Sequence, residues 1–202
     1  MPDGMRPSRA RRITGSAGAA GGRAARAAQT FSTTQELRDM VRFETTHGAF
    51  TIELFPKEAP VTVENFLRYV DDGFFDGTLF HRIVPGFVIQ GGGLTADFHN
   101  KETRASITNE AKNGLKNKRG WLSMARTSDI NSATSQFFVN LSDNAFLDNG
   151  PRDFGYAVFG RVTEGMDTVD KIAKVGTGKR KGYQDAPLED VLIVSARRVD
   201  AA

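Results

Sequence analysis

Short segments in which apolar and polar residues alternate recur from Met40 onward, and this pattern restricts the chain to a mainly β fold. The clearest case is "VRFETTHGAFTIELF", where Val41 and Phe43 precede a turn and Phe50 and Ile52 follow it. Alternation with a period of two places these side chains on one face of a hairpin. Further short strands are predicted around residues 79–84, 88–91, 121–125, 136–140, 157–163 and 190–199.

Two segments have a helical period instead. In "APVTVENFLRYVDDG", Pro60 suits a first helical turn and Gly73 suits the stop, and one apolar stripe contains Val63, Phe66, Leu67 and Val70. The segment "EGMDTVDKIAKV" predicts a second, shorter helix. About eight strands with two helices predict a closed barrel that is capped by the helices.

Composition divides the chain at Met40. Residues 1–39 carry seven Arg, no Lys and three acidic residues, whereas residues 40–202 have a net charge of −1. Residues 1–30 have no aromatic side chain, so they bury too little surface to offset the entropy of ordering. We predict a disordered Arg/Ala/Gly-rich extension over 1–39 and one globular domain over 40–202. The extension is interpreted as a tag or an upstream start, with an organelle transit peptide as the alternative.

Several classes of site are excluded or disfavoured by residue content. The chain has no cysteine, which removes disulfides, thiol nucleophiles and cysteine-ligated metals. No apolar run approaches the length of a membrane span. The near-neutral domain does not favour nucleic-acid binding. The three histidines lack metalloprotease spacing, and Gly91-Gly92-Gly93 lacks the Lys-Ser/Thr of a phosphate loop. We predict no metal and no cofactor.

The stretch "FHRIVPGFVIQGGG" (80–93) places two polar residues in a hairpin of short apolar strands. A two-residue Pro-Gly turn would direct Arg82 and Gln90 to opposite faces. A three-residue loop that includes Phe87, which we predict, instead pairs Val84 with Val88 and Arg82 with Gln90, on one face. Taken alone, the pattern also fits an edge arginine and a strand-end glutamine with no chemical role.

Two further segments accompany this hairpin, "GWLSMARTSDINSATSQFFVNLSDNAFLD" (120–148) and "FGYAVFGRVTEGMDTVDKI" (154–172). Together, the three motifs resemble the cyclophilin family of peptidyl-prolyl cis–trans isomerases, most closely its bacterial cytosolic branch. The resemblance spans residues 40 to 199 and implies an eight-stranded antiparallel barrel with two helices. It implies catalytic-site roles for Arg82, Phe87, Gln90 and Phe138, and substrate-binding roles for Val88, Ala125, Arg126, Gln136, Phe146, Leu147 and Tyr156.

Four of these positions depart from residues that are common in the family. Val88 replaces a Met, and Tyr156 stands where His is frequent. Arg126 replaces an Asn, so only its main-chain contacts with substrate are expected to carry over. Phe146 replaces the Trp of many eukaryotic members. An indole donates a hydrogen bond that a phenyl ring cannot, and we therefore expect weak binding of cyclosporin-type macrocycles.

The resemblance implies an isomerase that needs no cofactor and acts on X–Pro bonds in peptides and in unfolded or nascent chains. A non-catalytic peptide-binding or holdase module that uses the same groove is the alternative. Arg82 favours catalysis, because a pure binder does not require the arginine. We expect a monomer in the cytoplasm, or in an organelle if residues 1–39 are a transit peptide.

Overall fold

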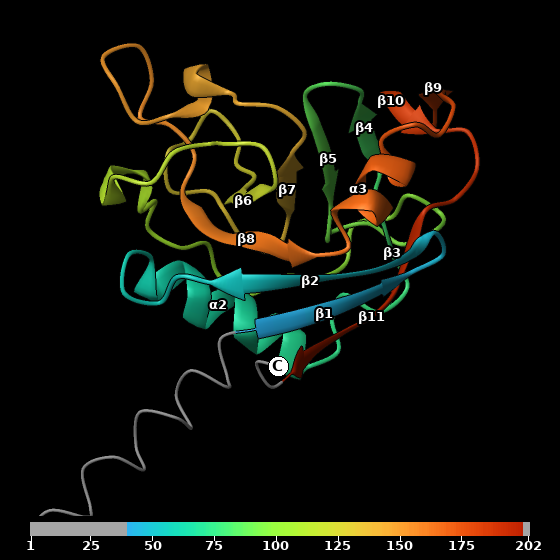
Figure 1. Cartoon of the computed structure of the whole chain (residues 1–202), viewed down its shortest axis with the longest axis horizontal. Coiled ribbons are helices and arrows are strands. Elements are labelled where there is room, and N and C mark those ends of the chain that lie inside the picture. Colours follow the sequence, from blue (N-terminus) through green and yellow to red (C-terminus); the bar gives the residue numbers. More distant parts are fainter. Residues whose placement is uncertain (1–39, 200–202) are drawn as a thin grey trace, which may run out of the picture.

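The computed structural model describes residues 40–199, and the extension predicted for residues 1–39 lies outside them. The described fold is mainly β (Figure 1). Its strands are β1 (Met40–Thr45), β2 (Gly48–Leu54), β3 (Thr78–Leu79), β4 (Arg82–Val84), β5 (Val88–Gly91), β6 (Trp121–Met124), β7 (Phe137–Asn140), β8 (Val158–Glu164), β9 (Thr177–Arg180), β10 (Tyr183–Pro187) and β11 (Leu192–Val199). Its helices are α2 (Pro60–Asp71) and α3 (Met166–Ile172), with 3₁₀ turns η1 (Ala111–Asn113) and η2 (Ala145–Leu147).

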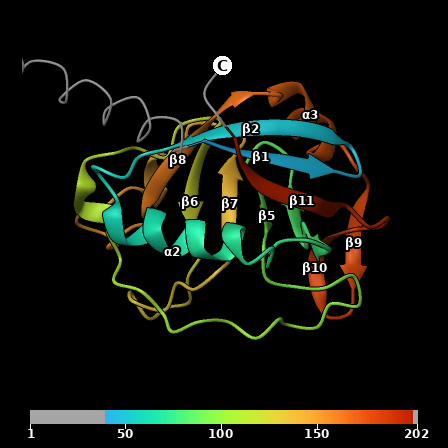
Figure 2. The same ribbon diagram turned by 90° about the horizontal axis from the view of Figure 1, so that it is seen from below.

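Nine of the strands form one curved antiparallel sheet in the order β3-β11-β1-β2-β8-β6-β7-β5-β4. The end strands of this order, β3 and β4, are consecutive in the chain, and only Phe80 and His81 separate them. The main chain therefore joins the two edges of the sheet and gives it the shape of a barrel. Figure 2 shows α2 lying across one end of the curved sheet. The mainly antiparallel β fold with two helices is confirmed.

The predicted apolar faces form the core. Phe43 and Phe50 lie opposite each other on β1 and β2, and their rings stack at 4.9 Å. Phe66 on α2 is 1% exposed and contacts Phe137 and Phe159 with ring-centroid distances of 5.7 and 4.9 Å. Aromatic pairs of this kind stabilise a core beyond their buried area. The helix stripe predicted from the sequence is therefore the face that covers the sheet.

Contacts with distant parts of the chain determine where both helices begin. Glu110 accepts hydrogen bonds from the Val61 and Thr62 N–H groups (3.1 and 2.8 Å), which satisfies free donors in the first turn of α2. Gly165 precedes α3 with φ +76°, and a Cβ there would lie 2.3 Å from the Ala49 carbonyl oxygen. Only glycine fits this close approach to β2.

The structure has more strands than the sequence pattern indicated. The strand predicted over 79–84 divides into β3 and β4, and the small β9–β10 sheet was not predicted. The segment "TGKRKGYQDAP" (177–187) is rich in charged residues and has no alternation, so it gave no strand signal. This small sheet lies beside β4 (Figure 1), and it brings an additional carboxylate to the hairpin.

Candidate active site

The β4–β5 hairpin has the predicted register. Its pairs are Arg82–Gln90, Ile83–Ile89 and Val84–Val88, so the loop is Pro85-Gly86-Phe87. The Phe87 N–H donates to the Val84 carbonyl oxygen at 3.0 Å, and Gly86 has φ +74°. Arg82 and Gln90 therefore share one face of the hairpin, and the prediction of a three-residue loop is confirmed.

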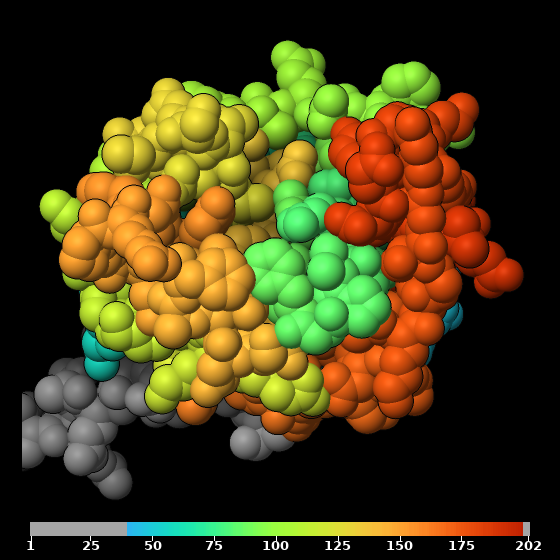
Figure 3. Space-filling view, turned by 90° about the horizontal axis from the view of Figure 1, so that it is seen from above, coloured from blue at the N-terminus to red at the C-terminus, as the bar shows by residue number. Residues whose placement is uncertain are grey.

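A pocket of about 160 Å³ opens on this face. Figure 3 views the side of the molecule where the hairpin, the segment around 140–156 and the β9–β10 sheet meet. The hairpin pocket, as we call it, is lined by Arg82, Phe87, Val88, Gln90, Ala125, Arg126, Phe138, Leu147 and Tyr156. All nine are site residues named from the sequence; Gln136 and Phe146 are not in this lining.

The floor of the hairpin pocket is apolar. Val88, Phe138 and Leu147 are buried and form a cluster separate from the main core. β5 and β7 are paired so that Gln90 lies opposite Phe138, and the Phe138 ring meets the Tyr156 ring edge-on at 5.7 Å. The result is an apolar socket that carries a few polar groups on its rim, as is typical of small-ligand sites.

The Arg82 side chain, at this rim, has few contacts with the rest of the protein. Its side chain is 40% exposed, and its Nε lies 3.6 Å from Oδ2 of Asp185 on β10. Its guanidinium carbon lies 5.7 Å from the centre of the Phe87 ring. Among residues 40–199, no acceptor lies within 3.5 Å in hydrogen-bonding geometry of the Arg82 guanidinium. Asp185 was not predicted as part of the site, because β10 itself gave no signal.

Two glutamines form a hydrogen-bonded pair beside Arg82. Gln90 Nε2 donates to Gln136 Oε1 at 3.1 Å. Gln136 in turn packs on Gly93, where a Cβ would lie 2.5 Å from its Cγ atom. Gly93 thus allows the Gln136 side chain to approach the backbone closely. Gln136 does not line the pocket, and it is connected to the pocket through its hydrogen bond with Gln90.

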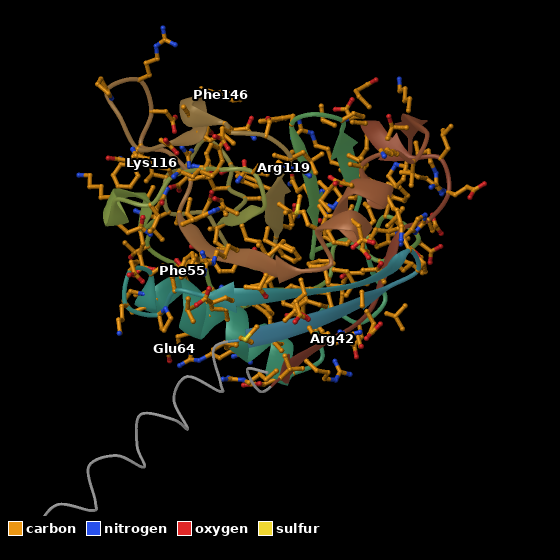
Figure 4. The ribbon with its side chains drawn as sticks, viewed as in Figure 1. Arg42, Phe55, Glu64, Lys116, Arg119 and Phe146 are labelled. Carbon is orange, nitrogen blue, oxygen red and sulfur yellow. The ribbon has the colours of Figure 1, made fainter. Side chains whose placement is uncertain are left out.

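Phe146 lies at the outer rim, on η2 (Figure 4). Its side chain is 66% exposed, and its ring stacks on Phe87 with 5.5 Å between the ring centroids. The neighbouring Leu147 points the other way and is buried in the pocket floor. Phe146 therefore extends the apolar surface beyond the pocket without closing it.

Only the main-chain contacts of Arg126 with substrate were expected to carry over from the family, and the structure places Arg126 in the lining of the hairpin pocket. The side chain is 5% exposed and forms an ion pair with Asp153. Its Nε donates to the Gly155 carbonyl oxygen at 3.2 Å, and its Nη1 donates to the Thr127 carbonyl oxygen at 2.9 Å. These partners follow Arg126 by up to 29 residues and come from a loop, so strand patterns could not reveal them.

Three further residues, each with a side chain that could carry a function, lie outside the pocket lining. His81 is 3% exposed, and burial together with the neighbouring Arg82 charge lowers its pKa to about 4. Trp121 packs on Phe55 at 5.2 Å. Asn140, in a formal glycosylation sequon, is fully buried and donates to the Trp121 carbonyl oxygen at 2.9 Å. His81 is thus neutral near pH 7, and the Asn140 side chain is inaccessible.

Among residues 40–199, no three His, Cys, Asp or Glu side chains are grouped as metal ligands would be, and no helix has the length and apolarity to cross a membrane.

Comparisons with known proteins agree with this geometry. The sequence model described as "Cyclophilin type peptidyl-prolyl cis-trans isomerase/CLD" matches residues 40–198. Peptidyl-prolyl cis-trans isomerase A of Dickeya dadantii is 52% identical over 157 residues, which are 78% of this chain and 83% of the relative. Peptidyl-prolyl cis-trans isomerase B of Escherichia coli is 51% identical over 159 residues, which are 77% and 97% of the two chains.

A solved structure is also similar. It is a Cryptosporidium parvum cyclophilin type peptidyl-prolyl cis-trans isomerase crystallised in the presence of the dipeptide Ala-Pro. The TM-score is 0.66 at 27% identity, and the match covers 81% of this chain and 99% of that one. The chain belongs to the cyclophilin-type peptidyl-prolyl cis–trans isomerase family. Its activity is therefore the isomerisation of peptidyl-prolyl bonds, and the resemblance to bacterial members is confirmed.

Proposed function

We propose that the hairpin pocket binds the proline of an X–Pro bond and that Arg82 lowers the barrier to rotation. Rotation of the planar amide costs roughly 18–20 kcal/mol because C–N resonance must be broken. In the twisted transition state, the nitrogen lone pair becomes a hydrogen-bond acceptor, which it is not in the planar state. An N–H of Arg82 directed at that nitrogen stabilises the transition state selectively.

The observation that carries this proposal is the free hydrogen-bonding capacity of Arg82 beside an apolar socket. Its single carboxylate neighbour, Asp185, is 3.6 Å away, and no closer acceptor within residues 40–199 occupies its donors. A guanidinium has five N–H donors and stays protonated at all physiological pH values. Arg82 can therefore donate to a substrate without first breaking a strong internal hydrogen bond.

The remaining pocket residues hold the substrate. We assign the pyrrolidine ring to the apolar socket of Phe87, Phe138 and Leu147, which are joined by Val88. Gln90 is positioned by Gln136 to donate to the substrate carbonyl. Ala125 already donates its N–H to the Gln136 carbonyl oxygen (2.9 Å), so its own carbonyl is the group left for the substrate backbone. No step in this scheme needs a proton transfer, a nucleophile or a cofactor.

The substrates that we propose are exposed X–Pro bonds in peptides and in unfolded or nascent chains, with the protein acting as a monomer in the cytoplasm. A transit peptide at residues 1–39 would instead direct it to an organelle. An open, partly exposed pocket suits flexible chains, because an extended segment can lie across it. Weak inhibition by cyclosporin-type macrocycles is part of the same proposal, since Phe146 has no N–H to donate.

An isomerisation assay on a proline-containing peptide tests the role of Arg82. Arg82→Ala should lower kcat/KM by at least about tenfold, because a hydrogen bond made only in the transition state is lost. The melting temperature should stay close to that of the wild type, since the side chain is at the surface. Unchanged turnover in the folded variant would remove Arg82 from the mechanism and favour the peptide-binding alternative.

A further inference from the structure

The Arg126 side chain connects β6 to the loop of residues 148–156, which forms one wall of the hairpin pocket. Arg126 follows the end of β6, and its buried guanidinium donates to the Gly155 carbonyl oxygen and pairs with Asp153. The Asp153 Oδ1 atom also accepts the Gly155 N–H at 2.7 Å. One guanidinium and one carboxylate thus fix both backbone groups of Gly155.

The same guanidinium lies over the ring of Tyr156. The Arg126 guanidinium carbon lies 4.6 Å from the centre of the Tyr156 ring, within the range of a cation–π contact. The ring is also contacted edge-on by Phe138. Tyr156 is therefore fixed between a floor residue of the pocket and a buried cation. The position of the ring therefore depends on where the Arg126 guanidinium is held.

Arg126 also borders a second space. It lines the hairpin pocket and, in addition, a cavity of about 10 Å³ next to Met124 and Ala157. A shorter side chain at this position would leave Tyr156 without support on one side. A planar guanidinium can stack on an aromatic ring and donate two hydrogen bonds in a fixed geometry, which an ammonium of similar charge cannot do.

We infer that Arg126 is a positioning residue for the isomerase: through its side chain it sets Gly155 and Tyr156 as a rigid wall of the proline-binding pocket. The inference rests on the proposed role of the hairpin pocket. Each of its nitrogens donates within the protein, to Gly155, Thr127 and Asp153. The guanidinium is thus held by groups within the protein, and we assign its effect on the substrate to Tyr156, on which it packs.

The other end of the loop has its own attachment. Asp148 Oδ1 accepts hydrogen bonds from the N–H and Nδ2 of Asn117 at 2.8 and 3.0 Å. The Tyr156 N–H donates to the Leu147 carbonyl oxygen at 3.0 Å, which closes the base of the loop. A substitution at Arg126 should therefore loosen the Gly155–Tyr156 corner while the chain stays folded.

A double-mutant cycle on the full chain tests this inference. Kinetic constants for a proline-containing peptide are measured for wild type, Arg126→Lys, Tyr156→Leu and the double variant. Arg126→Lys should raise KM by about three- to tenfold, as for loss of one charge-assisted contact, and leave kcat within about twofold. In the Tyr156→Leu background the same change should alter KM by less than about twofold, because the wall that Arg126 supports is already absent.

Arg119→Lys is the matched control. Arg119, labelled in Figure 4, also donates to one carboxylate, Asp170, and one backbone carbonyl, Leu141, at 2.9 Å each. It does not line the hairpin pocket, so its KM should equal that of the wild type. Asp153→Asn keeps a similar shape and weakens the ion pair, and should raise KM in the same direction by a smaller factor.

Equal effects of Arg126→Lys on KM in both backgrounds would overturn the inference, as would a KM equal to that of the wild type. A melting temperature measured for every variant separates a loosened pocket from a loss of fold. If Arg126→Lys does not fold, the KM of Asp153→Asn tests the inference in its place. The wild-type measurement reports isomerase activity by itself, so a failure of the proposed function would appear in the wild-type kinetics. The coupling between Arg126 and Tyr156 tests only the inference about Arg126.

Discussion

Arg82 and Arg126 line the same pocket, yet their guanidinium groups have different surroundings. The Arg82 side chain is 40% exposed on a hairpin, with one carboxylate at 3.6 Å. The Arg126 side chain is 5% exposed and donates to two carbonyl oxygens as well as to Asp153. An arginine that must serve a transition state needs donors left free in the resting enzyme, whereas one that shapes a wall uses its donors inside the protein.

The elements that carry the two arginines explain the contrast. Arg82 is on a strand whose register fixes its direction, so little further bonding is needed to aim it. Arg126 begins an irregular segment after β6, and the loop that it holds has no strand partner of its own. In this protein a paired hairpin orients the exposed arginine, while ionic and cation–π contacts hold the irregular wall.

The largest expected effect concerns the buried neighbour of the exposed arginine. The pKa of His81 falls from an ordinary 6.5 to about 4, first because of burial and then because of the Arg82 charge. Between about pH 4 and pH 6.5, the unfolded chain therefore binds a proton at His81 that the folded chain does not. The contribution of His81 to the free energy of unfolding is thus fully present above about pH 6.5 and declines as the pH falls toward 4. The loss should reach on the order of 3 kcal/mol.

Denaturant unfolding between pH 7 and pH 4 measures this loss. His81→Gln should flatten the pH dependence, because the titrating group is removed. His99→Gln is the control: His99 is exposed, and this variant should retain the wild-type slope. An unchanged slope in His81→Gln would show that other groups produce the acid sensitivity.

A smaller effect is expected on the loop side of the pocket, at Phe146. Phe146→Trp adds an indole N–H at a rim position that is 66% exposed and stacked on Phe87. A cyclosporin-type macrocycle with an unpaired acceptor there should bind about one to two orders of magnitude more tightly, for a gain of roughly 1–3 kcal/mol. Turnover of small peptides should change little, because the socket is made by other residues.

Inhibitor titration of the isomerase activity of both forms measures this change. The substitution does not involve either arginine, so it separates ligand affinity at the rim from catalysis at the hairpin. Nanomolar inhibition of the wild type would show that Phe146 does not limit macrocycle binding.

The hairpin side of the site was predictable from the sequence, whereas the loop side was predictable only in part. Alternation around the Pro-Gly turn, together with the choice of a three-residue loop, determines which residues share a face and pairs Arg82 with Gln90. The family resemblance named Arg126 and Tyr156, but the cation–π contact between them is a matter of tertiary structure. The pattern "RDFG" (152–155) was the available signal, since Asp153 folds back on Gly155.

The prediction of the fold from the sequence has the same limit. β1, β2 and both helices follow apolar periodicity, because burial of one face decides their conformation. β9 and β10 carry charges and do not alternate, and β10 lies beside β4 in the folded chain. Asp185 was missed together with them. Residues that reach a site from such segments have no periodic pattern from which to be predicted.

The most direct test of the division between the two arginines makes the same substitution at both. Lysine keeps the charge and loses the planar fork, so Arg82→Lys and Arg126→Lys differ only in where that fork is lost. Steady-state kinetics on one proline-containing peptide should show kcat lowered by about tenfold with little change in KM for Arg82→Lys. Arg126→Lys should show the reverse, a raised KM at an almost unchanged kcat. If the two variants change the same constant in the same direction, the two arginines share one role and this account is wrong.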